Sequence, residues 1–387
     1  MNAFIPGNKL TLLKNGAEYF PALETAFNLA QREIYVETYI FRADAIGQCI
    51  AAALCLAARR GVATHVVLDG FGSQDLPRSF VKEMEASGVK VRFYRPFSLS
   101  LTLRTHRLRR LHRKLVCVDN SIAFVGGINI QDDFDVPGVS DPRIDFAVAV
   151  EGPLLAEIHK TMLRLWSMLE WLQQKRRPRL TRLPETAIPS RGAIQARLVI
   201  RDNLRHRRDI EAFYLDGINN ARQEVIIANA YFLPGYQFRH ALIAAVQRGV
   251  KVILLLQGRV EYFFLHYATR TLYGNLLAAG IEIHEYQKSF LHAKVAVFDE
   301  RIVTVGSSNI DPFSLVLARE ANIVADDAGF ARELRASLNT LRDEGCSKIS
   351  EAHLKKEAWP MRIIAWLSFA GVRLLTGLTG YAFDEKR

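Results

Sequence analysis

The sequence contains few cysteines, and their spacing gives no support for a zinc site. Only Cys49, Cys55, Cys117 and Cys346 occur among the 387 residues, and no two of them form a CxxC pair. The HExxH pattern of zinc hydrolases is absent as well. We therefore expect neither a metal nor another cofactor. A reducing compartment suits these four thiols.

Long apolar runs are also missing. No window reaches the roughly 18 consecutive apolar residues that a membrane-spanning helix requires. Residues 1–16 lack the basic segment followed by an apolar run that marks a signal peptide. We therefore expect neither a transmembrane helix nor a secretory signal.

Acidic residues are outnumbered by basic ones. The chain has 51 Lys and Arg against 40 Asp and Glu, for a net charge of +11. Such a balance favours an anionic partner: a membrane surface, a phosphate-bearing substrate or nucleic acid. Hydrophobic residues still make up 49% of the chain, so a sizeable globular core is expected.

The chain is an internal repeat. In each half, runs rich in Ile and Val alternate with helical stretches, and Gly61 and Gly249 suit the ends of helices. This alternation predicts an α/β fold with two lobes related by a pseudo-twofold axis. Each lobe would be a mostly parallel mixed sheet flanked by helices. The segments that return in order are 30–41 as 221–232, 59–70 as 246–258, 87–96 as 279–288, and 112–130 as 292–310.

The repeat also predicts the domain boundaries. Residues 1–171 would form the N-terminal lobe and residues 197–345 the C-terminal lobe. The intervening residues 172–196 contain three prolines and many charges, as a linker does. Residues 346–387 match neither half and are expected to form a separate segment.

The most informative repeated pattern is a His-x-Lys pair. Residues two apart on a strand share a face, so His112 and Lys114 should point the same way, as should His292 and Lys294. A single such pair on a strand is more often a surface or core feature. Both copies keep the pair while the apolar residues around it differ, which favours a functional site.

An aspartate and an asparagine complete each copy of the pattern. Asp119 and Asp299 belong to the candidate catalytic set, but their odd offset from the histidines favours a structural role as hydrogen-bond acceptors. Asn129 and Asn309 follow small residues and can offer amide donors to a ligand.

Joined across a twofold axis, the two copies would surround a phosphate. Two lysines and two asparagines form a cradle for phosphate oxygens. Two imidazoles on opposite sides of the phosphorus suit an in-line displacement. One would attack phosphorus, and the other would protonate the leaving alcohol.

The chain contains two copies of the motif HxKxxxxD, each followed by G[GS]xN. In this respect the sequence resembles the phospholipase D superfamily over roughly residues 10–345. The stretches "YVETYIFRAD", "LDGFGS" and "GSSNIDPFS" are most similar to bacterial cardiolipin synthases of the type without N-terminal transmembrane helices. The resemblance implies one active site between the lobes and a phosphohistidine intermediate. It points to His112 as the nucleophile and His292 as the acid and then the base, although the sequence itself is symmetric on this point.

The resemblance also implies that an acidic residue after each motif orients a catalytic histidine. The matching positions are Asp145 and Glu320, for which an ordinary polar residue beside a strand is the alternative. One departure is Phe313, which stands where many family members have an arginine.

Two segments suggest contact with a membrane. Residues 358–383 are apolar but interrupted by Arg362 and Arg373, which is typical of a segment lying in one leaflet; a terminal helix docked on the protein's own core is the alternative. Residues 95–114 mix Phe and Leu with arginines, among them Arg104, Arg107, Arg109, Arg110 and Arg113, and could bind anionic headgroups or a nucleic acid backbone.

The expected function is a phosphatidyltransferase that makes cardiolipin from two phosphatidylglycerol molecules and releases glycerol. A phosphodiesterase or nuclease that uses water as acceptor is the alternative. The expected partners are phosphatidylglycerol, cardiolipin and a membrane surface, with no nucleic acid. The expected location is peripheral, on the cytoplasmic side of a bacterial inner membrane.

Overall fold

A computed structural model describes residues 3–96, 109–135, 138–174, 188–356 and 359–377. The first half contains β1 (Ile5–Lys14), α1 (Asn15–Leu29), β2 (Glu33–Thr38), α2 (Ala45–Arg59), β3 (Ala63–Asp69), α3 (Arg78–Ala86), β4 (Lys90–Tyr94), β5 (Lys114–Val118), β6 (Ile122–Gly126), β7 (Phe146–Glu151) and α4 (Leu155–Gln174).

The second half repeats this order of elements, with α7 and α8 in the place of α3 and an additional α9 before β14, and it extends the order at the C-terminal end. It contains β8 (Ile194–Arg201), α5 (Asp209–Asn220), β9 (Glu224–Asn229), α6 (Tyr236–Gln247), β10 (Lys251–Gln257), α7 (Phe263–Arg270), α8 (Tyr273–Ala278), β11 (Glu282–Tyr286), β12 (Lys294–Phe298), β13 (Ile302–Gly306), α9 (Pro312–Val316), β14 (Glu320–Asp326), α10 (Ala328–Gly345), β15 (Cys346–Ile349), α11 (Glu351–Lys356) and α12 (Trp359–Gly377).

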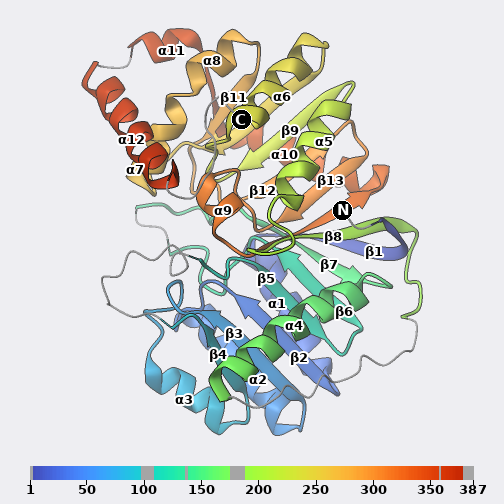
Figure 1. The fold of residues 1–387 in the computed structure, drawn as a ribbon. Helices are drawn as coiled ribbons and strands as arrows, with labels where there is room; N and C mark the ends of the chain where they lie inside the picture. The colour runs from blue at the N-terminus through green and yellow to red at the C-terminus, as the bar shows by residue number, and fades with distance from the viewer. Residues whose placement is uncertain (1–2, 97–108, 136–137, 175–187, 357–358, 378–387) are drawn as a thin grey trace.

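The strands of both lobes join into one sheet. The described strands lie in the order β15-β11-β10-β9-β12-β13-β14-β8-β1-β7-β6-β5-β2-β3-β4, which is the same order on either side of β8 and β1 apart from the added β15. The joint is an antiparallel pairing of β1 with β8, with Ile5 opposite Ala196 and Asn8 opposite Ile194. The predicted two-lobe α/β architecture is therefore present, with a continuous sheet between the lobes (Figure 1).

The sheet is mixed, as predicted, but antiparallel pairings outnumber parallel ones. In the N-terminal lobe only β2–β3 and β3–β4 are parallel. The other pairings in that lobe, from β2–β5 through to β1–β7, are antiparallel. The reason is local: β5 and β6 are joined by a short turn, which reverses the chain, whereas the parallel strands are joined through helices.

Helices cover both faces of each lobe, because the strands are apolar on both sides. In the N-terminal lobe, α1, α2 and α3 pack on one face and α4 on the other. Helix α2 begins where the Asp44 carboxylate accepts a bond from the Gly47 N–H at 2.8 Å. It ends before Gly61, whose φ of +93° lies in the left-handed region, and Gly249 has φ +87° after α6. These glycines confirm the predicted helix ends.

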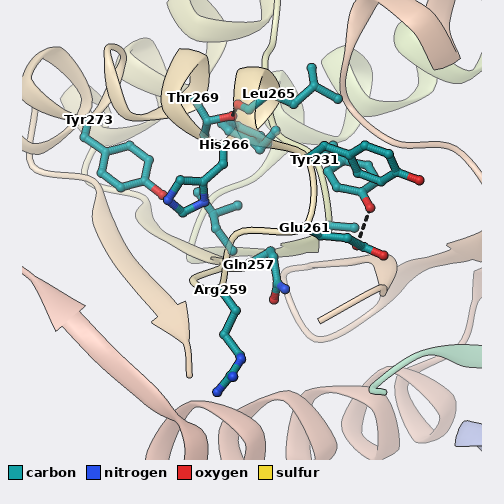
Figure 2. Close-up of a pocket in the computed structure, with 12 residues that line it drawn as sticks. Tyr231, Gln257, Arg259, Glu261, Leu265, His266, Thr269 and Tyr273 are labelled. Atoms are coloured by element: carbon teal, nitrogen blue, oxygen red, sulfur yellow. Dashed lines mark hydrogen bonds between the residues drawn. The ribbon is translucent and has the colours of Figure 1, made fainter. Parts of the chain in front are cut away.

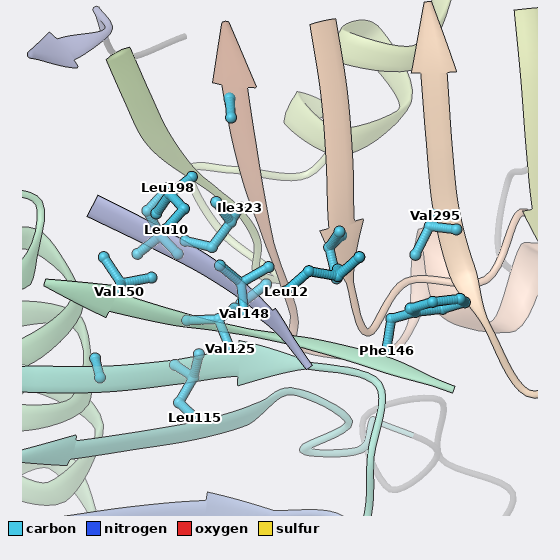
Figure 3. Packing of buried hydrophobic residues seen from close by; sticks show 14 of the residues in the cluster. Leu10, Leu12, Leu115, Val125, Phe146, Val148, Val150, Leu198, Val295 and Ile323 are labelled. Atoms are coloured by element: carbon cyan, nitrogen blue, oxygen red, sulfur yellow. The ribbon is translucent and has the colours of Figure 1, made fainter. Parts of the chain in front are cut away.

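One hydrophobic cluster bridges the lobes. Buried side chains of the N-terminal lobe, such as Leu12 and Val148, belong to the same cluster as Leu198 and Ile323 of the C-terminal lobe (Figure 3). Burial of this shared apolar surface stabilises the two lobes as one unit.

The predicted boundaries around the linker and the C-terminal segment need correction. Strand β8 begins at Ile194, inside the predicted linker, and residues 175–187 lie outside the described part. Residues 346–349 form β15, which pairs with β11 at the edge of the C-terminal sheet. The C-terminal lobe therefore extends past residue 345.

Helix α12 packs against α7 on the C-terminal lobe (Figure 1). Val372 is buried in the core cluster of this lobe, and Ala365 and Ser368 on the same face are buried as well. The alternative of a docked terminal helix is thus correct for the described residues of the segment. None of the described helices is long and apolar enough to cross a bilayer.

Candidate active site

The two histidines lie where the lobes meet. Each one precedes its strand instead of lying within it, because the chain there bonds to the opposite lobe. The backbone N–H of His112 donates to Arg319 O at 3.0 Å, and that of His292 donates to Ile144 O at 2.7 Å. These bonds place both histidines at the lobe interface, as the repeat predicts.

Each imidazole contacts a carboxylate from the opposite lobe. Nδ1 of His112 lies 2.9 Å from Glu320 Oε1. Nδ1 of His292 lies 2.6 Å from Asp145 Oδ2. Both carboxylates are almost fully buried. A carboxylate accepting from Nδ1–H leaves Nε2 unprotonated and free to react.

The two carboxylates are supported differently. Ser307 Oγ donates to Glu320 Oε2 at 2.5 Å. The equivalent residue in the first motif is Gly127, where an added Cβ would collide with the Asp145 carboxylate. The shorter Asp145 thus approaches the backbone at a glycine, whereas the longer Glu320 is held by a hydroxyl.

The motif lysines are buried beside the histidines. Lys114 Nζ donates to His112 O at 2.7 Å, and Lys294 Nζ donates to His292 O. Lys294 Nζ also lies 3.5 Å from Asp145 Oδ2. Two cations and two carboxylates therefore share one buried site, and a phosphate would bring additional negative charge to the lysines.

Burial is the main cause of the pKa shifts in this site. Burial lowers the pKa of Lys114 to about 7. The negative charge of Glu320 opposes this shift, whereas the positive charge of Lys294 adds to it. Burial also lowers the pKa of His112, which Glu320 partly offsets. The pKa of His292 falls well below its ordinary value, through burial and then the charge of Lys294. Both shifts favour the neutral form of the imidazoles.

The asparagines are buried next to the motif strands. Asn129 uses Oδ1 to accept from Ile40 N at 3.2 Å, which leaves its amide N–H₂ for a ligand. Asn309 is 3% exposed, and its Oδ1 has no hydrogen-bond partner within the described chain. A buried amide with spare bonding capacity suits a ligand site.

The two motif aspartates lie apart from this site, which corrects their inclusion in the catalytic set. Asp119, at the far end of β5, accepts from the N–H groups of Gln31, Arg32 and Glu33 at 2.7–2.8 Å. Asp299 accepts from the three equivalent N–H groups at the start of β9. Both aspartates hold a strand start in place and do not touch the histidines.

Arg113 does not have the expected role in binding anionic headgroups. Its side chain is 2% exposed and paired with Glu37 at 2.9 Å, so it does not belong to a headgroup-binding surface. Arg104 and Arg107 of the same arginine-rich stretch lie outside the described residues.

Two residues that support the histidine segments were not predicted from the sequence. Asp69 Oδ2 accepts from Leu111 N at 2.7 Å, and Gln257 Oε1 accepts from Leu291 N at 2.7 Å. Each one therefore fixes the residue before a motif histidine. The signal was available in the repeat, because Asp69 and Gln257 occupy the same place, before the final glycine, in the matching segments "VVLDG" and "LLLQG".

Comparisons with known proteins identify the family of this chain. A family model described as cardiolipin synthase, phospholipase D-like domain, matches residues 23–135 and 214–342. The chain is 40% identical over 385 residues to cardiolipin synthase B of Escherichia coli, covering 97% of this chain and 90% of that protein. The chain belongs to the cardiolipin synthase family. A second relative is the major cardiolipin synthase ClsA of Bacillus subtilis, 29% identical over 86% of this chain and 68% of that one.

Solved structures share the fold of this cardiolipin synthase family member. A phosphatidylserine synthase from Haemophilus influenzae superposes with a TM-score of 0.70 at 12% identity, over 97% of this chain and 96% of that one. A polyphosphate kinase from Porphyromonas gingivalis superposes with a TM-score of 0.60 at 15% identity, over 96% and 53% of the two chains. These likenesses concern the fold.

The described part of the chain contains no cluster of three or more His, Cys, Asp or Glu side chains that could hold a metal ion. Lys114 and Lys294 supply two cationic groups to the site, and such groups can balance the charge of a phosphate.

Proposed function

We propose that the chain is a phosphatidyltransferase that makes cardiolipin from two phosphatidylglycerol molecules and releases glycerol. The observation that carries this proposal is the pair of histidine–carboxylate contacts across the lobes, which surround two buried lysines. Together with membership in the cardiolipin synthase family, this arrangement supports a displacement at phosphorus in two steps.

In the first step, Nε2 of His112 attacks the phosphorus of one phosphatidylglycerol. A P–N bond forms as the P–O bond to the glycerol headgroup breaks. Protonated His292 gives its proton to that oxygen, and glycerol leaves. The His112 role follows the family resemblance, and substrate negative charge favours protonation of His292 in the complex.

In the second step, a hydroxyl of another phosphatidylglycerol gives its proton to His292. Its oxygen forms a P–O bond as the P–N bond to His112 breaks, and cardiolipin is released. Two phosphatidylglycerols thus give one cardiolipin and one glycerol, and both histidines return to their initial state.

The surrounding groups have electrostatic and positioning roles. Lys114, Lys294, Asn129 and Asn309 bind the phosphate oxygens, whose charge increases in the transition state. Glu320 and Asp145 are positioning residues that fix the tautomer of the histidines and stabilise the imidazolium form.

We also propose that the outer face of α12 meets the membrane. Ile363, Trp366 and Leu367 are 47%, 65% and 57% exposed on this helix. Phe263 and Phe264 are 47% and 68% exposed on the neighbouring helix α7. Exposed aromatic and aliphatic side chains on two packed helices, in a protein of net charge +11, suit peripheral binding to an anionic bilayer on the cytoplasmic side.

Lipid mass spectrometry tests the proposed reaction. Purified protein is incubated with phosphatidylglycerol vesicles, and cardiolipin and glycerol are expected in equal amounts. His112→Ala and His292→Ala should each reduce the rate at least about 1,000-fold. Phosphatidic acid as the main product would instead identify water as the acceptor, and cleavage of DNA with no lipid product would support a nuclease.

A further inference from the structure

A hollow lies beside the active site at the carboxyl ends of β9 and β10, beneath α7 (Figure 2). It encloses about 340 Å³, part of which is open to solvent. Hydroxyl, amide and charged side chains line it together with apolar side chains that include Phe232 and Leu256. The polar lining includes Tyr231, Gln257, Arg259, Glu261 and His266.

Backbone contacts tie this hollow directly to His292. Gln257 accepts from the N–H of Leu291, on one side of the histidine, at 2.7 Å. The N–H of Ala230 donates to the carbonyl of Ala293, on the other side, at 2.9 Å. Both Ala230 and Gln257 line the hollow. A group bound there would therefore lie against the segment that carries His292.

The hollow presents a carboxylate held in a fixed position. Arg143 Nη1 donates to Glu261 Oε1 at 2.9 Å, and the hydroxyl of Tyr231 donates to Glu261 Oε2 at 2.5 Å. Arg143 precedes Ile144, whose carbonyl accepts from the His292 N–H, so the Glu261 contacts and the histidine share one support. A carboxylate paired in this way stays ionised and acts as a strong hydrogen-bond acceptor.

An unused donor complements the carboxylate. The side-chain Nε2 of Gln257 is buried and has no hydrogen-bond partner among the described residues, although its Oε1 is bonded to Leu291. Burying an amide N–H₂ group without a hydrogen-bond partner costs free energy. An oxygen atom of a ligand would provide the missing partner. The hollow thus combines an acceptor with a donor, as recognition of neighbouring hydroxyl groups requires.

The two lobes differ at this point. Ala230 occupies the repeat position of Tyr39, whose ring lies 4.9 Å from the His112 ring in an edge-on arrangement. Gln257 occupies the position of Asp69, which makes the same contact to Leu111 but carries no N–H₂ group. An aromatic ring therefore covers His112, whereas a small residue and an amide lie beside His292.

We propose that the hollow is the subsite for the polyol headgroup of the acceptor alcohol. This inference rests on the proposed function, in which His292 takes the proton of the acceptor hydroxyl. One hydroxyl of a vicinal diol donates to Glu261, and a neighbouring oxygen accepts from Gln257 Nε2. A simple monohydric alcohol can make only one of these bonds, and a phosphate placed here would be repelled by the Glu261 carboxylate. Glu261 and Gln257 therefore set the preference for polyols.

Competition between two alcohols tests the subsite. The enzyme is incubated with phosphatidylglycerol labelled in its acyl chains and an equimolar mixture of ethanol and isotopically labelled glycerol. The ratio of labelled-headgroup phosphatidylglycerol to phosphatidylethanol is measured by mass spectrometry. We expect this ratio to fall about tenfold in Glu261→Gln, which loses the charge of the acceptor. Because the ratio is internal to each sample, the folded fraction of a variant cancels.

A second variant probes the donor separately. Gln257→Glu keeps an oxygen for Leu291 N, as Asp69 does in the other lobe, but removes the Nε2 donor. It should also lower the ratio about tenfold. The matched control is Glu85→Gln on the exposed surface of α3, which should behave as wild type.

The outcomes separate the subsite from the reaction itself. The subsite proposal is overturned if the product ratio changes by less than twofold in both Glu261→Gln and Gln257→Glu. It is also overturned if each of these variants loses the two products to the same extent. Neither result contradicts the proposed phosphatidyl transfer. A wild-type enzyme that forms neither product overturns the proposed phosphatidyl transfer, and the subsite with it.

Discussion

The imidazole of His112 lies 2.9 Å from the carboxylate of Glu320, which comes from the opposite lobe. The hydrogen bond of Nδ1 is to Glu320 Oε2 at 3.1 Å, and Ser307 donates to the same oxygen, so both side chains hold this carboxylate in place. The reactive state of one lobe's histidine therefore depends on a side chain of the other lobe.

Replacing this carboxylate by an amide should disable the enzyme without unfolding it. Glu320→Gln keeps the size of the side chain but removes the charge that stabilises the imidazolium and fixes its tautomer. We expect kcat to fall about 100-fold or more, with an unchanged thermal midpoint. The measurement is the initial rate of cardiolipin formation, with the exposed Glu333→Gln on α10 as control. A loss below about threefold would contradict the positioning role.

Gly127 provides a test of the other carboxylate. An added Cβ would collide with both oxygens of Asp145, so Gly127→Ala should push this group away from His292. A displacement of this kind costs roughly 100-fold in rate. Gly274→Ala on α8 is the matched control, because a Cβ there meets nothing within 4 Å. Equal activity of the two variants would show that the Asp145–His292 contact is dispensable.

The pH dependence of the reaction should reflect Lys114. Burial lowers the pKa of its amine to about 7, so the cation is present below that pH and is lost above it. Since phosphate binding needs the cation, kcat/KM should decline as pH rises through about 7. In Lys114→Arg the guanidinium stays charged, and this alkaline limb should disappear even if the rate is lower. A wild-type kcat/KM that stays constant between about pH 7 and pH 9 is incompatible with this role.

Stability should depend on two histidines far from the site. His65 and His159 are buried beside Tyr35, and burial lowers the pKa of each to about 4. Nearby cations, Lys90 for His65 and Arg32 for His159, act in the same direction. The unfolded chain binds protons at a higher pH than the folded one, so stability falls as pH drops below about 6.5.

The size of this effect is measurable by denaturant unfolding. Each histidine should remove about 2 kcal/mol from the free energy of unfolding between pH 6.5 and pH 5. His65→Phe, which can keep the stacking on Tyr35, should remove its share of the dependence. Identical slopes of stability against pH in wild type and His65→Phe would refute the assignment.

Membrane binding should depend on the outer face of α12. Replacing Trp366 and Leu367 by serine removes two exposed apolar side chains, and we expect partitioning to anionic vesicles to weaken at least tenfold. Sedimentation with phosphatidylglycerol vesicles measures this change. Leu29 and Leu56, which are 69% and 51% exposed, provide the control when both are changed to serine. Equal losses in the two double variants would mean that binding is not localised on α12.

The repeat in the sequence was enough to predict the lobes, the two histidines and the two lysines. Side chains at fixed spacing on equivalent strands must occupy equivalent places, and the structure brings all four to the lobe interface. Asp145 and Glu320 were reached through the family resemblance. That each would contact the histidine of the other lobe could not be predicted, because it depends on how the lobes pack.

Other features depend on contacts that a local pattern does not record. The pairing of β1 with β8 joins strands from two lobes whose relative position is fixed by the shared core. Strand β15 is short and half exposed, so its four residues carry little strand signal. The hollow at Glu261 is lined by Ala230, which occupies the position where the other copy has Tyr39, and its shape depends on how several elements pack together.

The joint between β1 and β8 has a consequence for turnover. Strand β1 is hydrogen-bonded to β7 on one side and to β8 on the other, so the two lobes cannot swing apart without breaking the backbone ladder. In the proposed reaction two lipids react in succession. We therefore expect the first headgroup to leave and the second lipid to enter while the β1–β8 pairing stays intact, without a hinge motion that separates the lobes.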